Sequence, residues 1–116
     1  MKPVHWMGSS LDDLRACPDE VQDIVGHALY PAQTGGKDDH AKPLKGFKGA
    51  GVLEIVADHA DGTYRSVYTV KFKAAVYVLH VFQKKSKRGI ATPQSELALI
   101  RQRLKDATSD AKGTTP

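Results

Sequence analysis

The residues with the clearest chemical potential are four cations at the end of an apolar, strand-like run. Residues 77–88 read YVLHVFQKKSKR, and no turn residue separates the run from Lys84, Lys85, Lys87 and Arg88. A strand is rigid, so it holds positive charge at a fixed place where a phosphate backbone can be met. The pattern predicts an anion site at the end of this strand and favours nucleic acid as the ligand.

The distribution of charge along the chain supports this interpretation. The 116 residues carry a formal net charge of +4, which by itself is only mildly basic. Residues 1–36 hold two Lys or Arg against five Asp or Glu, residues 37–88 hold eleven against five, and residues 89–116 hold four against three. The basic excess lies in the middle of the chain, which indicates an anionic partner rather than solubility alone.

Several classes of protein are disfavoured by composition. Cys17 is the single cysteine, so a disulfide framework and a thiol pair for zinc are excluded. The histidines show no metal-ligand spacing, and we expect neither a metal nor another cofactor. No apolar window of about 18 residues occurs and no signal-peptide pattern opens the chain, so we expect a cytoplasmic protein that does not enter the membrane.

The apolar pattern predicts one α+β domain with a short edge strand, two helices, a three-strand meander and a last helix. The expected elements are, in order, an edge strand at 4–7, helices at 10–16 and 18–30, strands at 52–57, 64–71 and 75–83, and a helix that begins at Thr92 and Pro93. The Tyr30-Pro31 pair is expected to end the second helix. Residues 32–51 are rich in Gly and Lys and are expected to be an irregular connection with a function of its own.

The last helix is expected to be amphipathic. Leu97, Ile100 and Leu104 would face inward, and Arg101, Arg103 and Lys105 would face water. From residue 108 the sequence has nothing to bury, so residues 108–116 are expected to be a frayed tail and residues 1–107 the folded domain.

Four segments in this order and spacing carry a resemblance to a known family. They are KPLKGF (42–47), GTYRSVY (62–68), VYVLHVFQKKSK (76–87) and TPQSELALIRQRLKD (92–106). Together they resemble the RelE/ParE toxin superfamily, and specifically its phage-derived, HigB-like toxin branch. The resemblance implies a RelE-like fold, in which a small antiparallel sheet packs against two N-terminal helices and is followed by a C-terminal helix.

The resemblance also implies a function. Such toxins are small endoribonucleases that cut messenger RNA, commonly on the ribosome, and are held inactive by a cognate antitoxin that often carries a helix-turn-helix. They use no metal. The ribose 2′-hydroxyl attacks the adjacent phosphorus, so the reaction needs a base, a cation for the phosphoryl oxygens, and an acid for the leaving 5′-oxygen.

The family pattern gives candidate roles to particular residues. Arg65 matches the strand arginine that holds the scissile phosphate, a task that suits a planar, permanently charged guanidinium. Lys84 and Lys85 match the catalytic cations at the strand end, where crowding of like charges would lower a lysine pKa. The RNA contacts expected around them are Lys45, Lys48, Lys87, Arg88, Phe82 and Tyr68.

The sequence departs from the RelE pattern at two places. The strand VLEIVA offers Glu54 where the pattern has lysines, and no tyrosine follows Arg88. The roles left open fall to His80, Tyr68, or the lysines of the glycine-rich connection. If the turn near Lys73 and Ala74 pairs Arg65 with Phe82, then Arg65, His80, Phe82 and Lys84 share one face of the sheet.

Other interpretations of the same residues stay open at this point. The cations at 84–88 would also suit a solvated strand end that prevents edge aggregation, and Arg65 would also suit a surface ion pair with Asp58 or Asp61. His80 is flanked by apolar residues and would suit a packed strand histidine. At the level of function, the alternatives are a ParE-like inhibitor of DNA gyrase, which is not an enzyme, and an inactive basic RNA-binding module.

Overall fold

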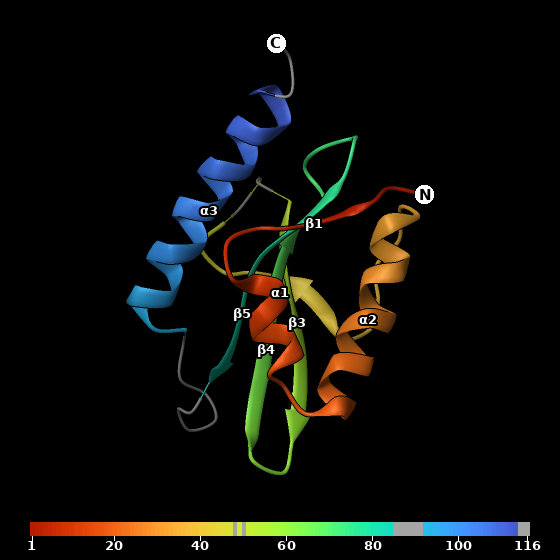
Figure 1. Ribbon diagram of the computed structural model, residues 1–116, viewed down its shortest axis with the longest axis vertical. Helices are drawn as coiled ribbons and strands as arrows, with labels where there is room; N and C mark the ends of the chain where they lie inside the picture. Colours follow the sequence, from red (N-terminus) through yellow and green to blue (C-terminus); the bar gives the residue numbers. More distant parts are fainter. Residues whose placement is uncertain (48, 50, 85–91, 114–116) are drawn as a thin grey trace.

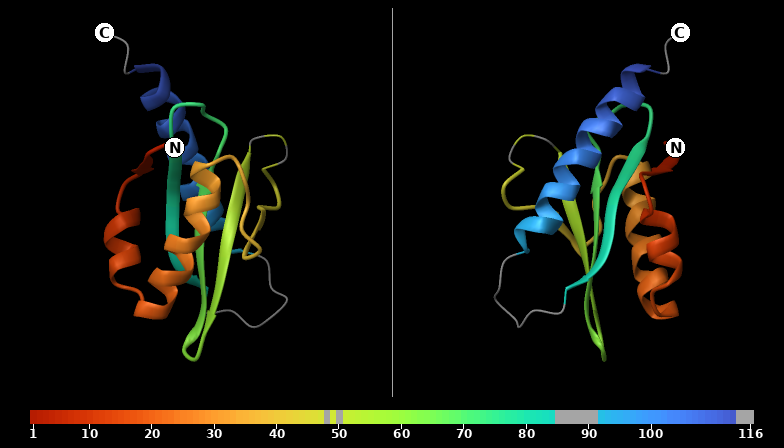
Figure 2. Two further views of the ribbon diagram at one scale, coloured as in Figure 1. Left: turned by 90° about the vertical axis from the view of Figure 1, so that its right-hand side faces the viewer. Right: turned by 60° about the vertical axis from the view of Figure 1, so that its left-hand side comes forward.

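The computed structural model describes residues 1–47, 49, 51–84 and 92–113, and these form three layers. A five-stranded sheet lies in the middle, with two helices on one face and the third on the other (Figures 1 and 2). The elements are β1 (Val4–Trp6), α1 (Ser10–Arg15), α2 (Asp19–Gln33), β2 (Ala41–Pro43), β3 (Val52–His59), β4 (Gly62–Thr69), β5 (Val76–Lys84) and α3 (Gln94–Gly113). No helix within these ranges is both long and apolar enough to cross a membrane.

The sheet has the strand order β1-β5-β4-β3-β2. β3, β4 and β5 form the antiparallel meander that the sequence predicts, whereas β1 joins the edge of β5 in parallel. β2 lies within the connection expected to be irregular and pairs antiparallel with β3. The predicted α+β class is confirmed, and the arrangement is consistent with the expected RelE-like fold.

The helix α2 packs on one face of the sheet through a regular apolar stripe. Its buried residues are Val21, Val25, Ala28, Leu29 and Ala32, and they share a core with Ile55, Tyr64, Tyr68 and Val78 of the sheet. Burial of each large aliphatic side chain stabilises the fold by roughly 1.5–3 kcal/mol.

The helix α2 continues through Pro31 to Gln33, so the predicted end at Tyr30-Pro31 is wrong. Proline is tolerated there because only one helical hydrogen bond in the last turn is lost.

The helix α3 covers the opposite face. The residues that it packs against the sheet are Leu97, Ile100, Leu104, Ala107 and Ala111. The helix runs to Gly113, so the predicted tail is wrong for residues 108–113, and residues 114–116 lie outside the described residues. The Tyr77 hydroxyl donates a hydrogen bond of 2.8 Å to the Asp110 carboxylate, which fixes the later turns of α3 on β5.

Arg103 of α3 does not face water, contrary to the sequence-based expectation. Its Nη1 atom donates to the Leu79 carbonyl at 3.0 Å, and its Nη2 atom donates to the Ser9 hydroxyl at 3.3 Å. Gly8 makes room for this arrangement, because a Cβ atom at that position would lie 2.8 Å from the Arg103 guanidinium. Arg103 therefore ties α3 both to β5 and to the turn between β1 and α1.

A β-bulge at Leu79 interrupts the pairing of β4 with β5. Val67 lies opposite His80 and Tyr68 lies opposite Val78, so Leu79 is an extra residue on β5. Because side chains alternate along a strand, one extra residue reverses which face the following side chains occupy. The bulge therefore turns His80 and its even-numbered successors to the face that α3 covers.

Substitution of Gly8 by Ala should destabilise the protein, because Gly8 has φ +53° and the new methyl group would displace Arg103. Left-handed backbone alone costs a non-glycine residue roughly 1–2 kcal/mol. The measurement is urea unfolding of the full chain. Gly26→Ala is the matched control: it lies inside α2 with nothing within 4 Å of the added Cβ, and it should stabilise by about 0.5–1 kcal/mol. Equal effects of the two changes would contradict the packing described for Arg103.

Candidate functional site

An ion pair joins the two central strands on the face that α3 covers. The Arg65 Nη1 atom on β4 contacts the Glu54 Oε1 atom on β3, and the exposed fractions of the two side chains are 15% and 7%. Arg65 lies opposite Val56 and Glu54 lies opposite Val67, so the pair bridges diagonal neighbours. The Arg65 Nε atom is buried and has no hydrogen-bond partner among the residues that the structure describes. The Nη1 atom of the guanidinium is thus bound by Glu54, whereas its Nε–H has no acceptor among the described residues.

The two aspartates considered as surface partners for Arg65 are bonded elsewhere. Asp58 accepts a hydrogen bond of 3.0 Å from the Thr63 hydroxyl, and Asp61 contacts the Nδ1 atom of His59 at 2.8 Å. The hydrogen bond to His59 holds the pKa of Asp61 below its ordinary value. The interpretation of Arg65 as a surface ion pair with Asp58 or Asp61 is therefore wrong.

Lys84 lies close to this pair. It is the last residue of β5, it lies opposite Thr63, and only 8% of it is exposed. Burial lowers the pKa of Lys84, and the positive charges of Arg65 and Lys42 lower it further, while Glu54 acts in the opposite direction. Because crowding and desolvation both disfavour the ammonium form, Lys84 can release a proton more readily than an ordinary lysine.

Glu54, Arg65, Lys84 and Lys42 are called the charged cluster below. Lys42 is exposed on β2 and lies opposite Glu54. The cluster holds three cations and one carboxylate, so its net charge is positive in a largely buried setting. A phosphate group that entered it would reduce the repulsion among the cations, whereas a metal cation would increase it.

His80 and Phe82 lie beside the charged cluster on β5. Their rings are stacked, with centroids 4.8 Å apart and an interplanar angle of 16°. The His80 Nε2 atom lies 3.1 Å from the Glu96 carboxylate, and the Nδ1 atom lies 3.4 Å from Nη1 of Arg103. Since both ring nitrogens face α3 side chains and His80 is 6% exposed, its observed setting is that of a packed histidine.

The conditional prediction that four residues share one face is confirmed. Arg65 pairs with Phe82, and after the bulge His80, Phe82 and Lys84 alternate onto the same face as Arg65. The structure therefore brings Arg65, His80, Phe82 and Lys84 together across two adjacent strands.

The other predicted site residues have different outcomes. Tyr68 lies on the opposite face, 1% exposed in the core beneath α2, and burial raises its pKa to about 12. The prediction that Tyr68 contacts RNA is therefore wrong, because no surface of its ring is accessible. Lys45 is exposed after β2. Lys48, Lys85, Lys87 and Arg88 lie outside the described residues.

Sequence reasoning missed two members of the charged cluster. Glu54 was interpreted only as the absence of a lysine, and Lys42 was given no role. A signal for Glu54 is present in the sequence, because an acidic residue within the apolar strand VLEIVA has to be buried and therefore needs a cationic partner. The partner itself is eleven residues away along the chain, on another strand.

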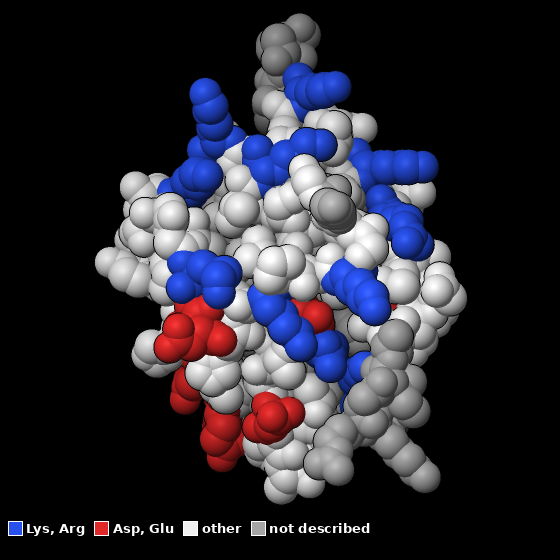
Figure 3. Space-filling model, turned by 180° about the vertical axis from the view of Figure 1, so that it is seen from behind, with Lys and Arg blue, Asp and Glu red and all other residues white. Residues whose placement is uncertain are grey.

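Lys and Arg side chains spread over the upper and central parts of the back of the molecule (Figure 3). Asp and Glu side chains gather at its lower left in the same view. Among the described residues, no three His, Cys, Asp or Glu side chains are grouped as a metal site requires. The chemistry that the described groups offer is proton transfer by a carboxylate and a lysine next to an arginine, a side chain whose planar fork suits a phosphate.

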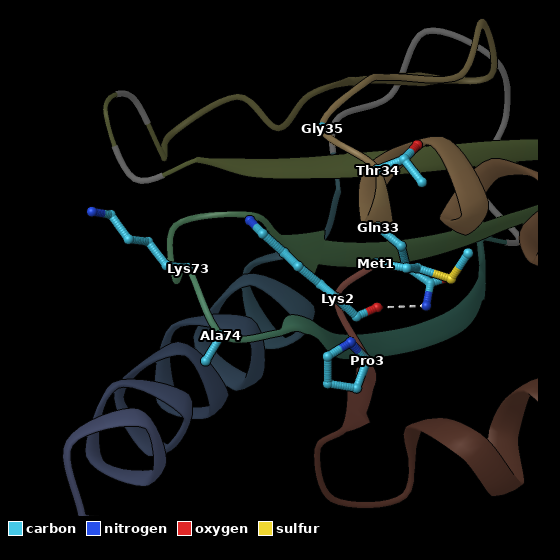
Figure 4. Close-up of a pocket in the computed structure, with 8 residues that line it drawn as sticks. All are labelled: Met1, Lys2, Pro3, Gln33, Thr34, Gly35, Lys73 and Ala74. Carbon is cyan, nitrogen blue, oxygen red and sulfur yellow. Dashed lines mark hydrogen bonds between the residues drawn. The ribbon is translucent and has the colours of Figure 1, made fainter.

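A surface pocket at another place contains no comparable chemistry. It lies between the N-terminus, the end of α2 and the turn before β5 (Figure 4). The Gln33 amide donates to the Lys2 carbonyl at 2.7 Å, the Lys2 ammonium donates to the Phe72 carbonyl at 3.3 Å, and Lys73 points away from the pocket. Its lining includes no carboxylate or imidazole side chain, so it offers no acid-base pair.

Comparisons with known proteins give one informative result. A model of the family described as phage-derived protein Gp49-like (DUF891) matches residues 12–105. The matched region contains the whole charged cluster, the bulge and the first part of α3. A search of curated proteins finds no significant match.

The buried pair makes a prediction about stability. Glu54→Leu and Arg65→Met, each made alone, should lower the free energy of unfolding by about 3–5 kcal/mol, because each leaves a buried charge without its partner. The double variant should recover much of that loss. Urea unfolding of the four proteins gives the coupling energy. Strictly additive losses would show that the two side chains do not stabilise one another.

Proposed function

The chain belongs to the Gp49-like phage-derived protein family, within the RelE/ParE-like toxin superfamily, and on this premise we propose that it is the toxin of a type II toxin-antitoxin system. We further propose that it is an endoribonuclease that cuts ribosome-bound messenger RNA without a metal and so arrests translation. The observation that supports this most is the charged cluster, in which an arginine, a lysine of lowered pKa and a carboxylate meet on one sheet face.

The proposed reaction transfers the phosphoryl group from the 5′-oxygen to the neighbouring 2′-oxygen. Glu54 accepts the proton of the 2′-hydroxyl as its oxygen attacks phosphorus, and Lys84 gives a proton to the leaving 5′-oxygen. The products are a 2′,3′-cyclic phosphate and a 5′-hydroxyl end. Arg65 offsets the negative charge that grows on the phosphoryl oxygens in the transition state.

The geometry of Arg65 allows it to serve both the base and the substrate. Its contact with Glu54 uses Nη1, and its Nε–H has no protein acceptor among the described residues. A guanidinium has five N–H donors in a planar fork, so Arg65 can bind Glu54 and a phosphoryl oxygen together when RNA displaces the atoms that cover the buried Nε. This arrangement would hold the Glu54 carboxylate close to the reacting phosphate.

His80 is proposed to act through its neighbour rather than by proton transfer. Its nitrogens face Glu96 and Arg103, and its ring supports the partly buried ring of Phe82. Phe82 lies directly opposite Arg65, so a base next to the scissile phosphate could stack on it. His80 is thus a positioning residue in this proposal.

The proposed partners are messenger RNA, the ribosome and a cognate antitoxin, and the proposed location is the cytoplasm. The antitoxin is expected to be a helix-turn-helix protein that places acidic or apolar residues over the cationic face. Lys45, exposed near the cluster, is proposed to hold the RNA backbone together with Lys48, Lys85, Lys87 and Arg88. Such binding would weaken steeply with salt.

The nuclease proposal predicts the effect of three substitutions on RNA cleavage. Arg65→Ala should lower kcat/KM by about 10²–10³, and Glu54→Gln should lower kcat by a comparable factor, because each removes one transition-state role. Lys84→Met should also lower kcat by a comparable factor, because it removes the group that gives a proton to the leaving oxygen. The measurement is cleavage of a labelled transcript by purified protein, in excess EDTA without ribosomes and in magnesium buffer with ribosomes, with identification of the product ends.

Matched controls separate chemistry from folding and charge. Arg15→Ala removes an exposed cation on α1, and Glu20→Gln removes an exposed carboxylate on α2; both should cleave like the wild type. Thermal unfolding of each variant reports the fold. If folded Arg65→Ala and Glu54→Gln cut RNA at the wild-type rate, the proposed mechanism is wrong. Growth arrest with intact transcripts and DNA-damage signalling would instead identify a gyrase inhibitor.

A further inference from the structure

An exposed arginine on α3 is held in place by an aromatic ring that belongs to the core. The Arg101 guanidinium carbon lies 5.2 Å from the centroid of the Phe47 ring. Phe47 is 8% exposed and packs in the same core as Ile100 and Leu104. The ring is therefore fixed, and the guanidinium above it is held by a cation-π contact rather than free to sample all its rotamers.

The backbone next to Phe47 lies close to this guanidinium. Gly46 has φ +94°, a conformation that glycine adopts without strain, and a Cβ atom there would lie 3.9 Å from Nη2 of Arg101. Lys45 is exposed immediately before it, and Lys105 is exposed one helical turn after Arg101. One cation, Arg101, thus lies over the fixed ring, and two exposed cations neighbour it, Lys45 on the segment that carries the ring and Lys105 on α3.

These cations have no acidic partner in the described part of the chain. No carboxylate there lies within 4.0 Å of the charged nitrogens of Lys45, Arg101 or Lys105, although six acidic side chains are elsewhere engaged in such contacts. Lys42 of the charged cluster lies three residues before Lys45 on the same segment. The positive charge therefore continues from the charged cluster along this segment to α3.

We propose that Arg101, with Lys45 and Lys105, forms a second phosphate-binding site, which holds the RNA strand beyond the nucleotides that enter the charged cluster. The proposal rests on the proposed function for its substrate class. A guanidinium held flat and exposed can take a phosphate with two parallel hydrogen bonds, and little entropy is lost because the side chain is already ordered. A ring stacked beneath it leaves its outer edge for the ligand.

The proposed site makes RNA length a determinant of affinity. A dinucleotide can occupy only the charged cluster, whereas an RNA of about a dozen nucleotides can reach α3 as well. The probes are 2′-O-methyl oligoribonucleotides of these two lengths, which have no 2′-hydroxyl and cannot be cleaved. Binding is measured by fluorescence anisotropy for the longer probe and by competition for the dinucleotide, over a series of salt concentrations.

Arg101→Ala should weaken binding of the longer probe roughly tenfold and reduce its salt slope by about 0.7, the value for one lost phosphate contact on a single strand. Binding of the dinucleotide should not change. The affinity of Arg101→Lys for the longer probe should lie between those of the wild type and Arg101→Ala, because lysine keeps the charge and loses the planar fork. Arg15→Ala, the same change on α1, should leave both affinities unaltered.

Two results would overturn the proposal. One is an unchanged affinity of folded Arg101→Ala for the longer probe; the other is an equal loss of affinity in Arg15→Ala, which would show only a general effect of net charge. Because the assay measures binding to RNA that cannot be cut, it gives an answer even if the protein has no nuclease activity. If the wild-type protein binds the longer probe through Arg101 but cleaves no natural RNA, the proposed function is rejected and the second site is kept.

Discussion

The extra residue at Leu79 is the constraint on which the described site depends. Tyr77 and the bulged Leu79 face α3, and after the bulge His80, Phe82 and Lys84 do so. Without it, alternation would turn Lys84 toward the α1 and α2 face, away from Arg65. The bulge is itself fixed from outside the sheet, because Arg103 of α3 donates to the Leu79 carbonyl at 3.0 Å. The position of the site's lysine therefore depends on a long-range contact to a helix that is distant in sequence.

A second feature of the structure is the charged cluster, a largely buried group in which cations outnumber carboxylates. Within the charged cluster, Glu54 is the one carboxylate beside Arg65, Lys84 and Lys42, and burial together with the neighbouring positive charges lowers the pKa of Lys84. A cluster of this kind adds little to stability, since apolar residues of similar volume would pack as well. Under the proposed function its value lies in ligand binding, because an incoming phosphate would supply negative charge to the cluster.

The parts of the fold with local signals could be predicted from the sequence. The stripe of α2, the turn at Gly62 and the start of α3 all rest on periodicity or on turn and cap residues. The bulge has no such signal, and neither does the inward course of Arg103, since each is decided by contacts between distant segments. Glu54 carried a signal in its apolar surroundings. Its partner could not be chosen without knowing which strands are neighbours.

The central claim is that Arg65 receives the phosphate while it stays paired with Glu54. Its most direct test is the NMR signal of the Arg65 Nε–H group, assigned by its loss in Arg65→Lys, during titration with an uncleavable 2′-O-methyl RNA. We expect a downfield proton shift, because the buried Nε–H gains a charge-assisted hydrogen bond that it lacks among the described residues. An Arg65 signal that stays unchanged at saturating RNA, while wild-type protein cleaves the matching natural RNA, would contradict it.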